Sequence, residues 1–279
     1  MAEIIAGIGT SHVPAIGAAI DHGKTEDPYW KPLFDGYKPA RRWMAEAAPD
    51  VAIVVYNDHA SSFFLDRVPT FAIGVADRFP IADEGYGPRA VPAVEGAPEL
   101  AWHLVDALVD DEFDMTICQE LEVDHGLTVP LSILYDQPVS WPVKVIPLAV
   151  NVIQYPTPTA RRCYKLGQAI RRAIASYPGS ERIAILGTGG MSHQLQGERA
   201  GFINQDFDRA FFQRLADDPE SLTKLTRTDY VRNAGSEGIE LILWLIMRGA
   251  LADDAALAYT HYHAPASNTG AGLCIFDDR

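Results

Sequence analysis

The sequence of 279 residues predicts a single-domain α/β sandwich, residues 1–279, with a mostly parallel or mixed central sheet. Short, continuously apolar runs recur along the chain, which is typical of strands covered on both faces. Segments with helical spacing lie between these runs, and such alternation is the pattern of α/β folds. With 48% hydrophobic and 22% charged residues, the composition is that of a globular protein with a sizeable core.

The apolar runs are the expected strands. They span residues 4–8, 51–56, 70–75, 143–150, 183–186 and 272–276. Three of them, 4–8, 51–56 and 183–186, lead into polar segments that contain a histidine. We therefore expect these three strand ends to carry functional side chains.

Helical spacing predicts the second kind of element. The expected helices span residues 98–110, 163–176, 207–215 and 237–247. A Tyr-Pro-Gly sequence at 177–179 ends the second of them. The last is apolar on nearly every side, which predicts a buried helix.

Two segments have the composition of long loops. Residues 79–98 contain four prolines and three glycines, and residues 28–43 are rich in aromatic residues and proline. Loops of such length inside a compact domain are usually functional or covered by a partner. Neither segment has the composition of a flexible linker, so the sequence predicts one domain.

Charge and cysteine content restrict the function classes. Acidic residues number 37 and basic residues 23, a net charge of −14 that disfavours nucleic acid and anionic membrane surfaces as partners. The three cysteines show no CxxC pairing and no apolar leader precedes them, so we expect reduced thiols in a cytoplasmic protein. The longest run without Asp, Glu, Lys or Arg, 255–276, contains histidines, a proline and glycines, and predicts no membrane span.

Three histidines occupy equivalent places. His12, His59 and His193 each lie just beyond the end of an expected strand. Ligands of open α/β sheets bind outside the carboxyl ends of the strands, where side chains from separate strands can converge. For any one of them alone, a surface or structural histidine is the simpler interpretation; together they favour a site.

Glu240 is the fourth candidate, because it lies in the otherwise apolar segment 238–247. Glutamate is rarely buried unless it is paired or bound to a metal. Two histidines and one carboxylate form the facial triad of non-haem Fe(II) enzymes, and the same set can hold catalytic zinc. The HExxH, GxSxG, P-loop and GxGxxG motifs are absent, so the residues alone predict a metalloenzyme with its metal undecided.

Local motifs extend this interpretation. The sequence contains GTSHVP at 9–14, YNDHA at 56–60, GTGGMSHQ at 187–194 and SEGIE at 236–240. Supporting stretches are DEGYGPR at 83–89, DHG at 124–126, WLIMRGAL at 244–251 and PASNT at 265–269. With these motifs the chain resembles the class III extradiol ring-cleavage dioxygenases over essentially its whole length, and most closely the catalytic β subunits of protocatechuate-cleaving enzymes.

The resemblance implies roles for individual residues. It implies that His12, His59 and Glu240 bind Fe(II) and that His193 is the catalytic acid/base. It places Asn57, His125, Ser267 and Asn268 in the substrate pocket. Metal-bound histidines generally need hydrogen-bonded partners, for which Asp58 and Asp124 are candidates.

The resemblance also implies a reaction and an assembly. The reaction is Fe(II)-dependent extradiol cleavage of protocatechuate, with dioxygen as co-substrate, to 4-carboxy-2-hydroxymuconate semialdehyde in the catabolism of aromatic, including lignin-derived, compounds. The implied fold is an αβα sandwich, with a small α subunit covering the active site in an α2β2 hetero-oligomer. Alternatives are a sister enzyme acting on gallate or an aminophenol, a zinc hydrolase using the same His/His/Glu set, and, last, a non-catalytic scaffold.

Overall fold

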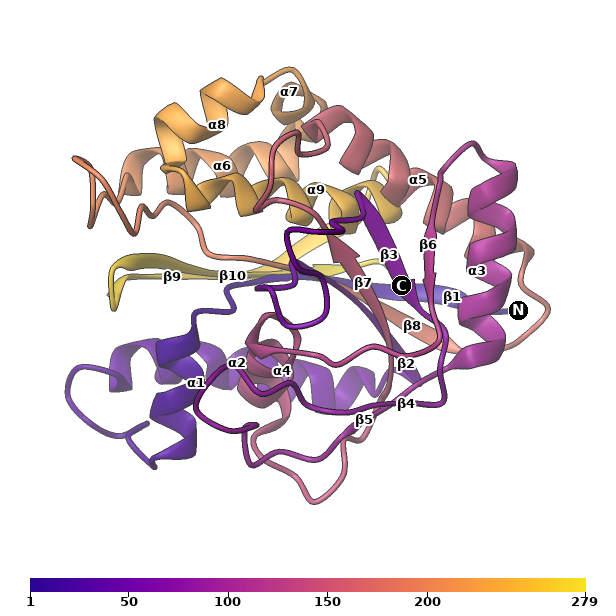
Figure 1. Ribbon diagram of the computed structural model, residues 1–279, viewed down its shortest axis with the longest axis horizontal. Helices are drawn as coiled ribbons and strands as arrows, with labels where there is room; N and C mark the ends of the chain where they lie inside the picture. Colours follow the sequence, from indigo (N-terminus) through magenta and orange to yellow (C-terminus); the bar gives the residue numbers. More distant parts are fainter.

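The computed structural model describes residues 1–279 and is built around one mixed sheet of eight strands (Figure 1). The strand order is β6-β3-β7-β2-β8-β1-β10-β9, and β4 and β5 form a separate short ribbon. The strands are β1 (Glu3–Thr10), β2 (Val51–Tyr56), β3 (Phe71–Gly74), β4 (Arg78–Phe79), β5 (Val94–Glu95), β6 (Thr116–Cys118), β7 (Lys144–Val150), β8 (Arg182–Thr188), β9 (Ala256–Ala266) and β10 (Thr269–Asp277).

Helices cover both faces of this sheet. They are α1 (Pro14–Asp21), α2 (Lys31–Ala47), α3 (Pro98–Asp110), α4 (His125–Tyr135), α5 (Ala160–Ser176), α6 (Gln205–Asp217), α7 (Pro219–Thr223), α8 (Arg227–Ala234), a 3₁₀ turn (Glu237–Glu240) and α9 (Leu241–Ala250). In Figure 1, α5 to α9 lie above the sheet and α1, α2 and α4 below it. Each interface has its own apolar core, of 49 buried residues on the α5/α9 side and 36 on the α4 side. The predicted αβα sandwich with a mixed sheet is confirmed.

The centre of the sheet positions the site. Strands β2, β8 and β1 are neighbours and run parallel, with Val55 opposite Gly187 and Thr10 opposite Thr188. All three are buried along nearly their whole length, as expected for apolar strands covered on both faces. Their carboxyl ends therefore meet at one edge, where the segments carrying His12, His59 and His193 begin.

One prediction about the fold is wrong. Residues 28–43 are not a loop, because most of them form the first part of α2. Pro32 occupies the first turn, where a missing N–H costs nothing, and the helix continues through Pro39. One face of α2 packs into the core through residues such as Leu33 and Tyr37, and this packing outweighs the proline.

The sequence analysis did not predict the strand β9. It is an edge strand, exposed or half-buried along most of its length, and pairs only with β10. No helix of the structure has the length and apolar character needed to cross a membrane.

Candidate metal centre

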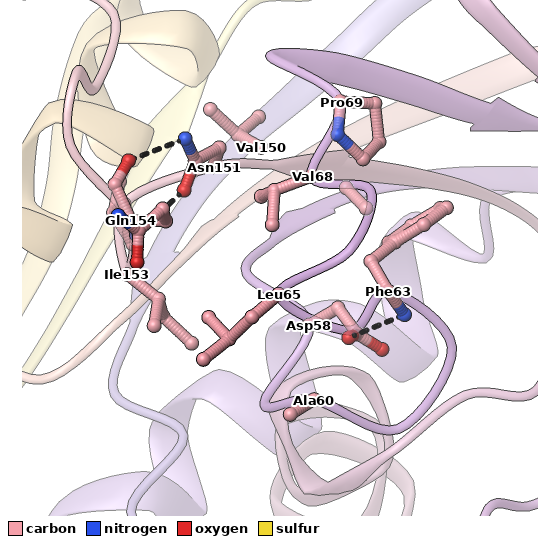
Figure 2. Close-up of a pocket in the computed structure, with 12 residues that line it drawn as sticks. Asp58, Ala60, Phe63, Leu65, Val68, Pro69, Val150, Asn151, Ile153 and Gln154 are labelled. Carbon is pink, nitrogen blue, oxygen red and sulfur yellow. Dashed lines mark hydrogen bonds between the residues drawn. The ribbon is translucent and has the colours of Figure 1, made fainter.

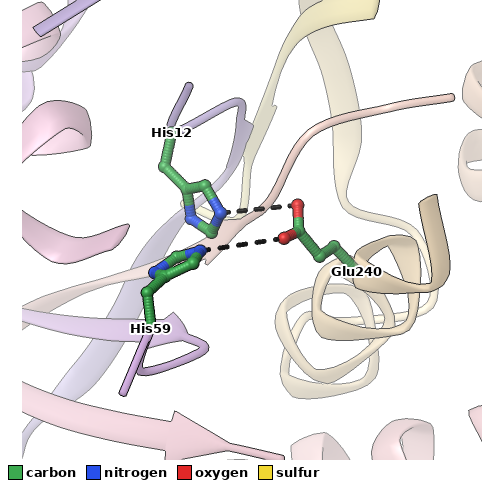
Figure 3. Close-up of side chains that lie close together, drawn as sticks. All are labelled: His12, His59 and Glu240. Atoms are coloured by element: carbon green, nitrogen blue, oxygen red, sulfur yellow. Dashed lines mark ion pairs between the residues drawn. The ribbon is translucent and has the colours of Figure 1, made fainter. Parts of the chain in front are cut away.

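The structure brings His12, His59 and Glu240 together at the carboxyl ends of β1 and β2 (Figure 3). His12 Nε2 lies 3.4 Å from one Glu240 oxygen, and His59 Nε2 lies 3.9 Å from the other. His12 and Glu240 are buried, and the side chain of His59 is one-quarter exposed. We call these three residues the triad.

Hydrogen bonds behind the triad determine the tautomer of His12. The Thr188 hydroxyl donates to the carbonyl of Gly126 at 3.3 Å, so it accepts from His12 Nδ1, 2.9 Å away. The proton of a neutral His12 is therefore on Nδ1, and its Nε2 lone pair faces Glu240. This buried Nε2 has no hydrogen-bond partner.

His59 is also held through its Nδ1, whereas its Nε2 lies 3.0 Å from the side-chain nitrogen of Asn57. Asp124 accepts from His59 Nδ1 at 3.1 Å and from the His59 backbone N–H at 2.6 Å. Burial lowers the pKa of His59, but the carboxylates of Asp124 and Glu240 outweigh it and raise that pKa to about 8. Burial likewise opposes ionisation of Asp124, yet His59 holds its pKa below the ordinary range. A carboxylate behind a metal-binding imidazole is the usual support of such ligands.

Glu240 completes the site from the opposite side. Its Oε2 accepts from the backbone N–H of Gly190 at 2.6 Å. That approach needs glycine at 189, where φ is +133° and an added Cβ would lie 2.7 Å from the Cβ of Glu240. Burial raises the pKa of Glu240, but the surrounding imidazoles outweigh it and leave the pKa well below the usual range.

The donor set fits a divalent metal. The Nε2 atoms of two imidazoles and an ionised carboxylate face one another, with these ligand atoms all within 4.8 Å. The Nε2 of His12 has no hydrogen-bond partner and the charge of Glu240 is buried, so a cation held by the three residues would satisfy both groups. Two histidines and one carboxylate suit non-haem Fe(II) with coordination positions left open.

His193 lies beside the triad, with its Nε2 4.0 Å from Glu240 Oε2. Its Nδ1 is 2.8 Å from the carbonyl of Met191, which can only accept, so Nδ1 donates and Nε2 is the basic nitrogen. The preceding residue, Ser192, is fixed by the buried Asp208, which accepts from the Ser192 N–H and hydroxyl and from Tyr262 OH.

These residues share a cavity of about 540 Å³ with the other predicted pocket residues. Asn57, His125, Ser267 and Asn268 all line it. Ser267 and Asn268 form the turn between β9 and β10, and Tyr29 OH accepts from the Ser267 N–H at 2.8 Å. No lysine or arginine lines the cavity.

Sequence reasoning missed two supporting residues and left a third undecided. Asp124 contacts His59, whereas Asp58 accepts backbone N–H groups of residues 61–63 and serves its own loop. Thr188, the partner of His12, is the last residue of β8 and lies within the GTGGMSHQ stretch, but was assigned no role. Glu84, whose carboxylate contacts both His125 Nδ1 and the His125 N–H, lies within the DEGYGPR stretch but was assigned no role.

We compared the chain with models of known protein families. Residues 6–273 match the family described as the catalytic LigB subunit of aromatic ring-opening dioxygenase. The protein belongs to the LigB family. The expected class III extradiol family is thereby confirmed.

Two curated relatives belong to the same enzyme group. A gallate dioxygenase of Pseudomonas putida is 47% identical over 199 residues, covering 71% of this chain and 58% of that protein. A 2,3-dihydroxyphenylpropionate/2,3-dihydroxicinnamic acid 1,2-dioxygenase of Photorhabdus laumondii is 32% identical over 187 residues, covering 67% of this chain and 55% of that protein. The chain thus spans little more than half the length of these relatives.

A solved structure matches the fold over nearly the whole chain. It is the crystal structure of an uncharacterized protein from Escherichia coli K12, with a TM-score of 0.63 and 14% sequence identity. It covers 97% of this chain and 99% of its own, and at this identity it supports the fold alone.

Proposed function

We propose that this LigB-family protein is an Fe(II)-dependent extradiol dioxygenase that opens the ring of a small catecholic acid. The observation that carries the proposal is the triad, in which two imidazole nitrogens and a buried carboxylate face one cavity that His193 also lines. When bound there, Fe(II) supplies Lewis acidity towards the catechol oxygens and a route for electron density from the ring to dioxygen. Family membership favours this activity over a zinc hydrolase.

His193 is the proposed acid/base. Its Nδ1 hydrogen bond to Met191 leaves Nε2 free to take a phenolic proton and return it later. The hydrogen bonds that Ser192 donates to Asp208 hold this loop, so the imidazole is oriented before substrate binds. Imidazole suits the task because it exchanges protons near neutral pH.

We propose gallate as the substrate, on the ground of one relative. The gallate dioxygenase of P. putida supports the alternative expected from the sequence over protocatechuate, which differs from gallate by one ring hydroxyl. Without lysine or arginine in the cavity, we assign the substrate carboxylate to the turn of Ser267 and Asn268. A site that hydrogen-bonds the extra hydroxyl could discriminate by up to about 10⁴-fold, whereas one that merely admits it gives about 10²-fold or less.

Oxygen uptake by the Fe(II)-loaded protein tests the proposal. Gallate, protocatechuate and an aminophenol are compared by kcat/KM, with mass spectrometry for a product carrying both atoms of dioxygen. Gallate is expected to give the highest value. Protocatechuate as the better substrate would restore the first expectation, and turnover without oxygen or iron would overturn the reaction class.

We also propose a small partner subunit that covers the cavity mouth. Leu65, Ile153 and Leu195, which we call the rim, are 78%, 51% and 49% exposed. Ile153 and Leu195 line the cavity, and Figure 2 shows Leu65 and Ile153 pointing toward one another over an adjoining apolar pocket. Exposed apolar side chains gathered at a site mouth favour a protein contact there. We further propose a cytoplasmic location, with which the three unpaired, buried cysteines are consistent.

A further inference from the structure

One carboxylate holds His125 at two points. The Glu84 Oε1 accepts from the His125 backbone N–H at 2.9 Å, and its Oε2 contacts the ring nitrogen Nδ1. His125 is the first residue of α4, and Asp124 caps that helix through the N–H of Gly126. Glu84 therefore fixes both the start of a helix and the orientation of the ring that leaves it.

This contact also determines which ring nitrogen faces the cavity. Burial raises the pKa of Glu84, but the bonds from His125 outweigh it and the pKa lies below its ordinary value, so the group is a carboxylate. A carboxylate only accepts, so His125 Nδ1 must donate. The Nε2 atom is left for the cavity that His125 lines.

The segment that carries Glu84 is held independently of His125. The Asp83 side chain accepts from the N–H groups of Gly85 and Gly87, both at 2.8 Å. At the far end of the segment, Arg89 makes paired hydrogen bonds to Asp21 at 2.8 and 2.7 Å. These bonds reduce the conformational freedom that Glu84 would otherwise lose on contacting His125.

His125 and His193 lie beside different members of the triad. The His125 ring stacks on that of His59, with centroids 3.9 Å apart, whereas His193 lies against Glu240. Both imidazoles line the cavity in which a substrate ring at the triad would be seated. Only one of them, His193, is oriented by a backbone carbonyl; the other depends on a side chain 41 residues away.

We propose that Glu84 is a positioning residue for substrate binding: it holds His125 in the Nδ1-protonated form, so that Nε2 accepts a hydrogen bond from a ring hydroxyl of the catechol. The inference rests on the proposed function for its substrate and on the geometry of the pair for its mechanism. Glutamine at 84 keeps the size of the side chain and replaces one acceptor oxygen with a donor, which removes the requirement that Nδ1 donate.

The tautomer can be measured without metal or substrate. Nitrogen NMR of ¹⁵N-histidine-labelled, metal-free protein is expected to report Nδ1 protonated in wild-type His125, and a mixed or Nε2-protonated ring in Glu84→Gln. Glu122→Gln, the same charge change at an exposed position two residues before Asp124, is the control and should match the wild type. An Nε2-protonated wild type, or a tautomer unchanged in Glu84→Gln, would overturn the proposal.

Kinetics test the consequence for substrate. Glu84→Gln is expected to raise KM, and the anaerobic Kd of the catechol, by about tenfold, with iron content unchanged and kcat altered less, because the lost interaction is one of binding. Glu84→Asp, which keeps a carboxylate, should recover part of the loss. An unchanged KM in a protein whose wild type is active contradicts this inference alone, whereas a wild type that opens no catechol ring contradicts the proposed function and leaves the NMR result standing.

Discussion

The floor and the rim of the cavity are built in opposite ways. The floor is the triad, and each member has a hydrogen-bond partner behind it: Thr188 for His12, Asp124 for His59 and the Gly190 N–H for Glu240. The rim consists of exposed apolar side chains on connecting segments, and nothing in this chain covers them.

The chain builds the metal-binding floor by itself but leaves the apolar rim exposed. The floor is complete, because every group that orients a ligand atom comes from the same chain. The rim leaves apolar surface in water, which a second protein surface would bury favourably. Binding of metal should therefore be a property of this chain alone, and closure of the cavity a property of an assembly.

The largest expected effect is at the floor. Glu240→Ala removes the only charged ligand and should abolish stoichiometric iron binding, a greater loss than the about 10- to 100-fold caused by losing an outer partner. Metal content after anaerobic loading measures it. Full metal occupancy in this variant would show that Glu240 is not a metal ligand.

His193→Ala should separate chemistry from metal binding. We expect kcat to fall by about 10²- to 10⁴-fold, the usual contribution of a general acid/base, with iron content equal to the wild type. Steady-state oxygen uptake on variants of matched iron content measures the effect. A normal kcat would show that another group moves the proton.

Asp124→Asn tests the layer behind the floor. The amide cannot serve as the same anionic acceptor for His59, so metal affinity should fall by about 10- to 100-fold while the fold persists. Competition with a chelator measures affinity, and circular dichroism checks the fold. Wild-type affinity in Asp124→Asn would mean that metal binding depends on the triad and not on the Asp124 carboxylate.

Tyr262→Phe tests whether the hydrogen bonds around Asp208 stabilise the loop that carries His193. It removes one of the donors to the buried Asp208 and should lower the free energy of unfolding by about 1–3 kcal/mol. Burial raises the pKa of Asp208, against the bonds from Ser192 and Tyr262, so its contribution to stability is present at low pH and is lost as the pH rises through the folded-state pKa. The variant raises that pKa further, and denaturant titrations over a range of pH should therefore show a larger loss above the folded-state pKa of Asp208 than below it. A loss that does not change with pH would mean that Asp208 does not titrate over that range.

The smallest expected effect on stability is at the rim. Leu65→Ser should change the free energy of unfolding by no more than about 0.5 kcal/mol, because the side chain is already exposed. The same variant should weaken association with a co-expressed small subunit, measured by analytical ultracentrifugation. Val139→Ser, at a fully exposed position outside the rim, is the matched control. Equal association of both variants would argue against a partner at the rim.

The sequence allowed more of the floor to be predicted than of its surroundings. His12 and His59 follow apolar strands, as does the neighbouring His193, and Glu240 is a carboxylate in an otherwise apolar segment, at the end of the 3₁₀ turn before α9. Each is therefore an anomaly against a regular background. Sheet topology then brings strand ends together by a general rule. Thr188 and Glu84 break no local pattern, and their importance comes from contacts to residues 176 and 41 positions away.

The sequence analysis assigned α2 wrongly and missed β9, each for a specific reason. The prolines of α2 suggested a loop, whereas packing of one helix face against the core stabilises the helix. The strand β9 mixes alanine with tyrosine, threonine and histidine at a sheet edge, where burial imposes no apolar run. The burial of β9 is irregular and leaves no periodic signal, whereas α2 has a helical spacing of buried residues that its prolines obscured.

The place of β1 in the sheet has a consequence for synthesis. The strand begins at Glu3 but lies between β8, which begins at Arg182, and β10, which begins at Thr269. At about 5–20 residues per second, a ribosome needs roughly 10 to 40 s to deliver even the first of these partners. During that interval an apolar segment that already carries His12 has no strand to pair with, so the nascent chain depends on chaperones or on its own helices to keep it from aggregating.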